Sequence, residues 1–254
     1  MVTVADTAYS IAVVRADEST LPKEERLFED PYAHLFAAAG EHAREATQRV
    51  LDLQLMREGV RLRTRFIDDA VRDGLAAGLE QVVLLGAGFD ARGLRMPEIA
   101  EHGASVYEVD FGYQLHRKRE ILSAGNVSIP AHVAYVPVDF EAPDFDAELA
   151  SALEADGFRS GGGAVFVWEG VIGYISIPTI EKTLAFVART GGPLSRLVFT
   201  FAQFSFDPGT AATFTKRAGF RSCEDVGADQ AWRRYWSTEP HEYASVMRFG
   251  LATV

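Results

Sequence analysis

Short apolar runs alternate with amphipathic segments along most of the chain, starting near residue 80. Five such runs span residues 81–85, 105–110, 134–139, 164–169 and 197–201. The segments between them, at residues 113–124, 145–155 and 178–188, carry apolar side chains at the spacing of an α-helix. This alternation predicts an α/β fold in which helices cover both faces of a mostly parallel sheet.

Two further apolar runs, at residues 220–226 and 244–254, follow without a long helical pattern between them. Parallel neighbours need a long crossover connection, usually a helix, so we expect these two strands to pair antiparallel at one edge. The complete expectation is a Rossmann-like sheet of seven strands, mostly parallel, with an antiparallel edge strand.

The first part of the chain has a helical rather than an alternating pattern. Apolar residues recur at helical spacing within residues 41–56 and again within residues 63–79. Asp30-Pro31 interrupts the pattern, because proline fixes its own φ and disfavours helix at the residue before it. We therefore expect residues 1–78 to form a helical N-terminal extension that caps a core of residues 79–254, within a single structural unit.

Composition narrows the class of protein. The 254 residues are 48% hydrophobic and carry a formal net charge of -11, which disfavours contact with nucleic acid or anionic membranes. No apolar stretch reaches the ~18 residues of a membrane span, and the N-terminus lacks the pattern of a secretory signal. The sequence predicts a cytoplasmic protein with no nucleic acid and no membrane as partner, and its one cysteine cannot form an internal disulfide.

Glycines follow the first apolar run, in Gly86-Ala87-Gly88. Glycine allows a tight turn and a close approach of the backbone to a ligand, although an ordinary strand-to-helix turn would look the same. No glycine stands three residues after Gly88, where a dinucleotide-binding turn has one. The spacing therefore favours a nucleoside ligand that lacks a diphosphate.

Acidic residues stand at the ends of the second and third runs. Asp110 follows Gly88 by 22 positions, where a carboxylate can accept hydrogen bonds from both ribose hydroxyls, or can cap the next helix. Asp139 could accept from the exocyclic amine of adenine, while Phe140 packs on the ring; the alternative for Asp139 is a turn acid. Ligands of open α/β sheets bind at these strand ends.

Glu169 lies within an apolar stretch at the end of the fourth run. An unpaired buried carboxylate is costly, so we expect a cation beside it: the ammonium of a bound amino acid or an arginine of the chain. Arg63 could clamp a carboxylate in bidentate fashion, or lie on a solvated helix face. A ribose, an adenine, an ammonium and a carboxylate are the polar parts of S-adenosylmethionine.

At these residues the chain resembles the leucine carboxyl methyltransferase family, from about Arg15 to Ala188. The resemblance is carried by the order of several blocks: Phe28-Glu29-Asp30-Pro31-Tyr32, Arg63-Thr64-Arg65-Phe66-Ile67-Asp68, Val83-Leu84-Leu85-Gly86-Ala87-Gly88-Phe89-Asp90-Ala91-Arg92, Tyr107-Glu108-Val109-Asp110-Phe111 with Lys118 downstream, and Trp168-Glu169-Gly170-Val171-Ile172-Gly173-Tyr174. It implies a class I methyltransferase fold with a helical N-terminal cover over the active site.

The resemblance also implies roles for individual residues. The cofactor, S-adenosyl-L-methionine, would be bound by Arg63, Gly86, Ala87, Gly88, Asp110, Phe111, Asp139, Phe140 and Glu169. Arg63 would hold the cofactor carboxylate and Glu169 would lie near its amino group. Tyr174 would line the acceptor side, and Arg15 stands where relatives often carry a basic residue.

The chain departs from the family at two places. Ala91 and Gly93 replace the more usual threonine and alanine after the glycine turn. The stretch between Phe206 and Gly219 is short, where we expect many relatives to have a longer lid. The second departure affects the acceptor pocket and leaves the cofactor site untouched.

The expected reaction is an in-line displacement of methyl from the sulfonium, and the enzyme mainly aligns the reactants and excludes water. A carboxylate acceptor is already ionised at neutral pH, whereas a phenol or alcohol would need a base, for which His116 and His241 are the candidates. No set of metal ligands is evident.

The hypothesis is an S-adenosylmethionine-dependent O-methyltransferase acting on a small-molecule carboxylate. An NAD-dependent oxidoreductase and a non-catalytic protein that retains the cofactor site remain alternatives, and the oligomeric state stays open.

Overall fold

The computed structural model describes residues 4–41, 48, 54–207 and 209–254. The helical pattern at residues 41–56 therefore falls mostly outside the described residues.

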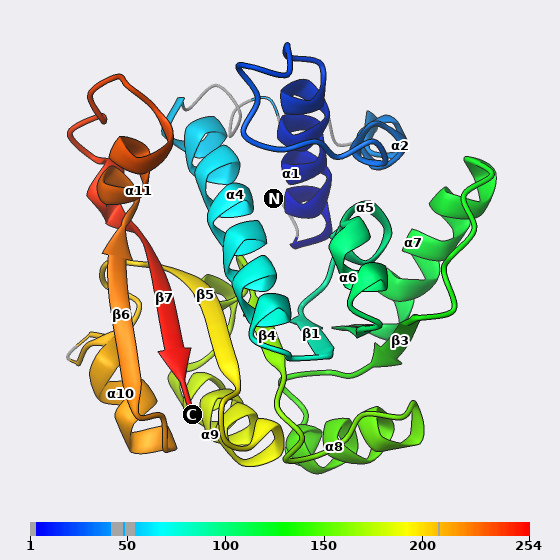
Figure 1. Cartoon of the computed structure of the whole chain (residues 1–254), viewed down its shortest axis with the longest axis vertical. Helices are drawn as coiled ribbons and strands as arrows, with labels where there is room; N and C mark the ends of the chain where they lie inside the picture. The colour runs from blue at the N-terminus through cyan, green and yellow to red at the C-terminus, as the bar shows by residue number, and fades with distance from the viewer. Residues whose placement is uncertain (1–3, 42–47, 49–53, 208) are drawn as a thin grey trace.

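Seven strands form one sheet in the part of the chain that is described (Figure 1). Their order is β3-β2-β1-β4-β5-β7-β6. The strands are β1 (Gln81–Leu85), β2 (Ser105–Asp110), β3 (Val133–Pro137), β4 (Val165–Trp168), β5 (Arg196–Ala202), β6 (Ser222–Gly227) and β7 (Met247–Thr253). All neighbouring pairs are parallel except those of β7, which runs antiparallel to both β5 and β6. The predicted fold class is confirmed, and the reversed strand is the second from the edge.

Helices cover both faces because successive residues of a strand point to opposite sides of the sheet. Val83 and Leu85 of β1 belong to one hydrophobic cluster and Val82 and Leu84 to another. The first cluster includes residues of α8 (Phe145–Ala155), α9 (Ile177–Gly191) and α10 (Ala211–Ala218). The second includes residues of α4 (Gln54–Ala76), α6 (Pro97–Glu101) and α11 (Ala228–Tyr235). An apolar layer therefore packs on each face of the sheet, as the alternation of apolar runs and amphipathic segments predicts.

The N-terminal helices α1 (Val4–Ser19) and α2 (Ala33–Ala39) pack against each other, and α1 also contacts α4. Asp30 ends the segment between them, because its Oδ1 accepts hydrogen bonds from the N–H groups of Tyr32 and Ala33, both at 3.1 Å. The predicted break at Asp30-Pro31 is therefore confirmed. Figure 1 shows α1 above the edge of the sheet at which the parallel strands end. None of the described helices is both long and apolar enough to span a membrane.

The turn after β1 is fixed by its neighbours. The N–H groups of Gly86 and Ala87 both donate to the carbonyl of Val109 at the end of β2, at 2.8 and 2.9 Å. Gly86 has a φ of 71°, and a Cβ placed there would approach Cγ2 of Val171 to 2.3 Å. Both observations require glycine at position 86. The chain then continues into α5 (Arg92–Arg95), while β2 leads into α7 (Gly112–Ala124).

Candidate functional site

A cavity of about 310 Å³ lies between α1 and the carboxyl ends of β1, β2 and β4. This volume falls at the lower end of the range for small-molecule sites. The lining includes nine of the ten residues that the sequence assigned to the cofactor or the acceptor side, namely Arg63, Gly86, Ala87, Gly88, Asp110, Phe111, Phe140, Glu169 and Tyr174. The structure therefore brings together residues that lie far apart in the sequence, at the edge of the sheet where ligands of such folds bind.

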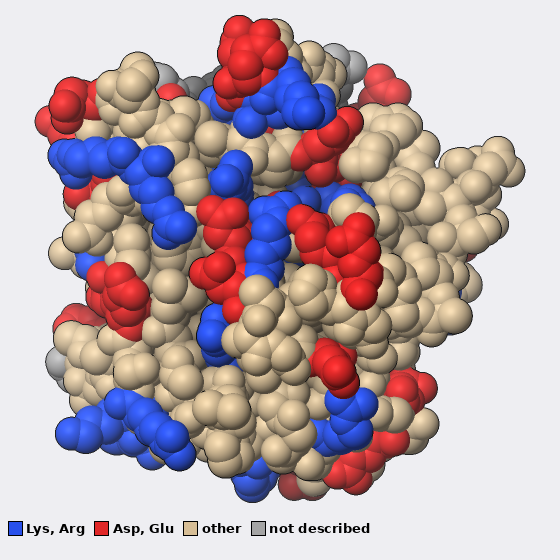
Figure 2. All heavy atoms as spheres, viewed as in Figure 1, with Lys and Arg blue, Asp and Glu red and all other residues tan. Residues whose placement is uncertain are grey.

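The charged residues of the lining are two arginines and four carboxylates: Arg15, Arg63, Asp90, Asp110, Glu141 and Glu169. An excess of negative charge favours a cationic ligand. Figure 2 shows acidic and basic side chains interspersed over one face of the molecule, with no single field of one sign.

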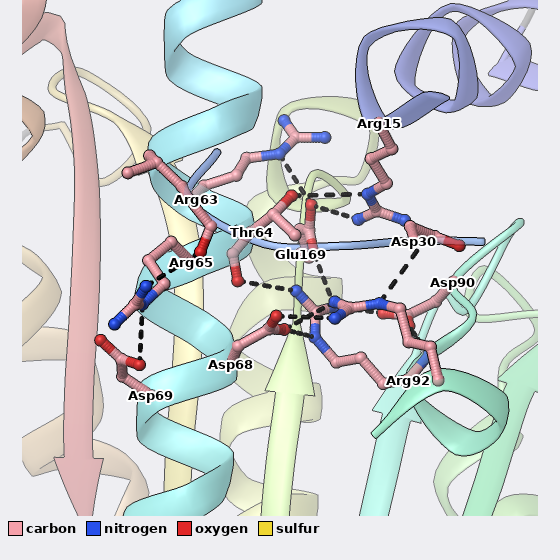
Figure 3. A network of polar contacts seen from close by, with 12 residues as sticks. Arg15, Asp30, Arg63, Thr64, Arg65, Asp68, Asp69, Asp90, Arg92 and Glu169 are labelled. Carbon is pink, nitrogen blue, oxygen red and sulfur yellow. Dashed lines mark hydrogen bonds and ion pairs between the residues drawn. The ribbon is translucent and has the colours of Figure 1, made fainter. Parts of the chain in front are cut away.

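Glu169, just beyond β4, forms ion pairs with three arginines (Figure 3). Its Oε1 lies 2.8 Å from Nη2 of Arg15 and 2.8 Å from Nε of Arg63, and its Oε2 lies 2.8 Å from Nη1 of Arg92. Burial by itself would raise the pKa of Glu169, but the charges of Arg15, Arg92 and Arg63 hold this pKa well below its ordinary value. The expectation of a cation beside Glu169 is met by arginines of the chain, one of the two partners that the sequence left open. A contact of Glu169 with a ligand ammonium stays a prediction.

Arg92 is a residue whose role the sequence reasoning missed. Its side chain is fully buried, and it joins three parts of the chain: Nε donates to Oδ1 of Asp68 on α4 at 2.8 Å, Nη1 to Asp90 and Glu169, and Nη2 to the carbonyl of Thr64 at 3.3 Å. Burial by itself would lower the pKa of Arg92, but the neighbouring carboxylates raise it well above its usual value. The sequence did offer one signal for this role, because two charged residues, Asp90 and Arg92, stand directly after the glycine turn.

Arg63 uses only part of its guanidinium within the chain. Nε donates to Glu169, whereas Nη1 and Nη2 have no hydrogen-bond partner among the described residues. Figure 3 shows these two terminal nitrogens directed away from Glu169. Burial lowers the pKa of Arg63, and the charges of Arg15 and Arg92 add to this effect while Glu169 opposes it. A ligand carboxylate at Nη1 and Nη2 would favour the charged form and fill the fork of the guanidinium.

Asp110 ends β2 beside the glycine turn. Its Oδ2 accepts from the N–H of Gly88 at 2.6 Å and its Oδ1 from the N–H of Phe111 at 2.7 Å. Burial raises the pKa of Asp110, against the effect of these two hydrogen bonds. The side chain does not cap α7, whose N-cap residue is Phe111. Each carboxylate oxygen keeps a further lone pair with which it can accept from a ligand hydroxyl.

Aromatic rings flank Asp110. Phe111 stacks on Tyr113 with ring centroids 5.4 Å apart and an interplanar angle of 19°, and both residues line the cavity together with the buried Phe140. Tyr113 was not anticipated from the sequence. These rings offer the flat apolar surface that an adenine requires.

Asp139 lies outside the lining of the cavity and is exposed. Its Oδ1 accepts from the N–H of Glu141 at 2.9 Å, which is the turn arrangement that the sequence left open. Glu141 itself lines the cavity, and its Oε1 accepts from the hydroxyl of Thr179 at 3.1 Å. A contact of Asp139 with adenine stays a prediction.

Tyr174 lies in the short 3₁₀ helix η2 (Ile172–Tyr174) and lines the cavity. Its hydroxyl donates to Oγ1 of Thr7 on α1 at 3.4 Å, and its side chain remains about half exposed. The contact joins η2 to α1 beside the cavity. A place of Tyr174 on the acceptor side stays a prediction.

Neither candidate base lies in the lining. His116 is exposed on α7 and pairs with Glu120 at 3.3 Å, while Nε2 of His241 lies 2.9 Å from Oε2 of Glu58. Within the ranges that the structure describes, no group of three or more histidine, cysteine or carboxylate side chains could hold a metal ion.

Known proteins resemble this chain in sequence. Residues 8–188 match the model of the family described as leucine carboxyl methyltransferase. A protein of Parafrankia sp. (strain EAN1pec) is 35% identical over 206 residues, and one of Streptomyces coelicolor is 34% identical over 208 residues. Both carry the provisional name S-adenosyl-L-methionine-dependent methyltransferase. The alignments cover 79% and 78% of this chain and 64% and 69% of the relatives, so the chain spans about two thirds of their length.

Solved structures agree with the fold. A crystal structure of a provisionally named methyltransferase from Thermobifida fusca superposes with a TM-score of 0.57 at 15% identity, over 99% of this chain and 94% of that chain. A protein of the duf574 family from Streptomyces avermitilis gives the same TM-score at 17% identity, over 95% and 96% of the two chains. At such identities the likeness concerns the fold alone.

Proposed function

The chain belongs to the leucine carboxyl methyltransferase family, and from this premise we propose that it transfers a methyl group from S-adenosylmethionine to a carboxylate oxygen of a small molecule. The family premise favours this cofactor over the NAD that the sequence left open. One observation carries the choice of acceptor: two guanidiniums, of Arg15 and Arg63, line the same cavity and both bind Glu169. Together they offer more N–H donors than one ligand carboxylate can take.

The residues present fit S-adenosylmethionine. Nη1 and Nη2 of Arg63 would hold the methionine carboxylate, and the free lone pairs of Asp110 would accept from the ribose hydroxyls. The glycine turn at Gly86 and Gly88 lets the backbone approach the ligand closely. Phe140 would pack on adenine, and the acidic lining suits a positively charged sulfonium.

Glu169 retains a smaller role toward the ligand. Its two oxygens offer about four lone pairs, of which the three arginine contacts use two on Oε1 and one on Oε2. The lone pair that remains on Oε2 can accept from the ammonium of the cofactor. Its main effect, however, is to orient Arg63, because it fixes Nε and leaves the fork of Nη1 and Nη2 for the carboxylate.

Arg15 would orient the acceptor. Its Nε and Nη2 contact Thr64 and Glu169, whereas Nη1 has no hydrogen-bond partner within the described ranges. A small-molecule carboxylate bound by Nη1 would be held as an ionised nucleophile, so the reaction would need no base. Tyr174, on the acceptor side, would complete the enclosure with α1. Neither of the candidate bases, His116 and His241, lies in the lining, which matches an acceptor that is already deprotonated.

When bound, S-adenosylmethionine would supply a methyl group activated by its sulfonium, and the acceptor oxygen would attack that methyl carbon in line with the departing sulfur. The O–CH₃ bond forms as the S–CH₃ bond breaks, the bonding pair of the latter stays on sulfur, and no proton is transferred. The positive sulfonium and the negative carboxylate become a neutral thioether and a neutral ester. The chain contributes alignment and exclusion of water, the two effects that dominate such displacements.

The chemistry of the labelled product tests this proposal. The protein is incubated with S-adenosylmethionine labelled in its methyl group and a panel of carboxylic acids, each matched by the alcohol or phenol of the same skeleton. The products are then treated with mild alkali. We expect label that becomes volatile as methanol, because alkali hydrolyses a methyl ester. Label that resists alkali, or that appears only with the alcohols and phenols, would contradict the carboxylate acceptor, and no transfer to any acceptor would contradict an active enzyme. The Asp110→Ala variant, which we expect not to bind the cofactor, is the control.

A further inference from the structure

We propose that Gln114 binds the ribose of the bound nucleoside together with Asp110, an inference that rests on the cofactor of the proposed function. Gln114 lies in the first turn of α7, where its N–H donates to the carbonyl of Phe111 at 2.9 Å. Its side chain lines the cavity, yet the residue is only 7% exposed. Its Nε2 is buried and has no hydrogen-bond partner among the residues that the structure describes.

The amide of Gln114 is an exception on the buried face of α7, because the other buried polar side chain there is paired. Lys118 follows Gln114 by four residues and shares its face of the helix. The ammonium of Lys118 is also fully buried, but it donates to the carbonyl of Asp90 and to the carboxylate of Glu108. Buried polar groups are nearly always paired in this way, and one that is not requires an explanation. A ligand in the adjoining cavity supplies the missing partner.

The chemistry of the neighbouring carboxylate points to a hydroxyl as that ligand group. Asp110 only accepts hydrogen bonds, and it precedes Gln114 by four residues at the same end of α7. A hydroxyl that donates to Asp110 still has lone pairs with which it can accept from an amide N–H. An acceptor and a donor in the lining of one cavity therefore match the two halves of a ribose hydroxyl, whereas a second carboxylate would match only one of them.

A matched substitution tests the contact. Methionine has nearly the shape of glutamine but cannot form the hydrogen bonds of an amide. We expect Gln114→Met to lower the affinity for S-adenosylhomocysteine about fivefold to tenfold in calorimetry, the loss of one uncharged hydrogen bond. For one of the two analogues, 2′-deoxy or 3′-deoxy S-adenosylhomocysteine, the variant and the wild type should bind with the same affinity, because that analogue lacks the hydroxyl that pairs with Gln114.

Stability provides a second readout. The free wild-type protein keeps an unpaired buried amide, so the Gln114→Met variant without ligand should have a Tm equal to or above that of the wild type. The Tm increase on addition of S-adenosylhomocysteine should be smaller in the variant. A loss of Tm in the free variant would mean that the amide stabilises the fold, and would overturn the inference.

The exposed His116 of the same helix provides the control, since His116→Gln should change neither affinity nor Tm. If Gln114→Met binds S-adenosylhomocysteine as tightly as the wild type, or loses the same factor for it and for both deoxy analogues, Gln114 does not bind the ribose. These results differ from failure of the proposed cofactor, in which the wild-type protein itself would not bind S-adenosylhomocysteine.

Discussion

Nε of Arg63 lies 2.8 Å from Oε1 of Glu169, although 106 positions separate these residues in the chain. The contact joins α4 to the end of β4 across the floor of the cavity and uses one edge of the guanidinium. The opposite edge, with Nη1 and Nη2, has no partner among the described residues. One buried carboxylate thus fixes the orientation of an arginine while leaving its fork available to a ligand.

Replacement of Arg63 tests this division of the guanidinium. Arg63→Lys keeps a positive charge but loses the planar fork, so its affinity for S-adenosylhomocysteine should fall at least tenfold, or by about 1.4 kcal/mol. Arg65→Lys is the matched control, because Arg65 lies two positions further along α4 and pairs with Asp69, which is not part of the cavity. Calorimetry on both variants measures the difference. Equal affinities for the two variants would show that Arg63 does not hold the ligand carboxylate.

Glu169 should stabilise the folded protein in a pH-dependent manner. Because its three arginines hold its folded pKa well below the ordinary 4.5, its ion pairs contribute fully above that value and are lost as the pH falls toward the folded pKa. Glu169→Gln leaves buried arginines without their shared anion and should lower the free energy of unfolding at neutral pH by about 3 kcal/mol.

Urea unfolding between about pH 7 and pH 4 measures this effect. The difference between wild type and Glu169→Gln should be largest at neutral pH and should shrink below about pH 4.5, since the wild type then begins to lose the contribution of its ionised carboxylate. A difference that grows as the pH falls would contradict the assignment of a lowered pKa to Glu169.

Asp139 can be tested with a ligand that lacks the group it is expected to bind. If its carboxylate accepts from the exocyclic amine of adenine, Asp139→Ala should weaken S-adenosylhomocysteine binding several-fold, about the effect of one hydrogen bond to a charged group. Binding of S-inosylhomocysteine, which carries an oxygen in place of that amine, should not weaken. Equal losses for both ligands would leave Asp139 with the turn at Glu141 as its only role.

Gly86 and Gly78 form a matched pair for the strain in the glycine turn. Both have positive φ, 71° and 85°, but a Cβ at Gly86 would meet Val171 at 2.3 Å, whereas a Cβ at Gly78 would meet nothing within 4 Å. Gly78→Ala should cost about 1 kcal/mol for its backbone conformation alone. Gly86→Ala should cost about 1–3 kcal/mol more from overpacking.

Thermal or urea unfolding of the two glycine variants checks this. Val171→Ala in the Gly86→Ala background should recover the overpacking part, because it removes the methyl group that the new Cβ meets. Similar stabilities for the Gly86→Ala and Gly78→Ala variants would mean that the turn relaxes freely.

Much of the fold was predictable because its signals are local. Buried parallel strands form continuous apolar runs, so residues 81–85 and 105–110 were predicted with the bounds that β1 and β2 have. The position of β7 between β5 and β6 was not, because strand order depends on contacts between residues far apart in the chain. The helix bounds of α8 were predicted to the residue, whereas α9 extends further at both ends than its apolar pattern.

The site likewise has residues that the sequence predicts and residues whose roles depend on contacts made only in the fold. Strand-end residues such as Asp110 could be predicted, because the carboxyl ends of parallel strands meet at one edge. The partners of Glu169 could not be ranked, since Arg15, Arg63 and Arg92 come from three separate segments that only the fold brings together. Gln114 gave no signal at all, because a polar residue on a helix is ordinarily exposed.

Calorimetric titration of the wild-type protein with S-adenosylhomocysteine, with NADH as the parallel ligand, tests the central claim most directly. The account predicts one site per chain with a Kd in the micromolar range for S-adenosylhomocysteine and no binding of NADH. Absence of binding of S-adenosylhomocysteine, or binding of NADH in its place, would contradict it, and the acids at the strand ends would then serve the fold or another nucleotide.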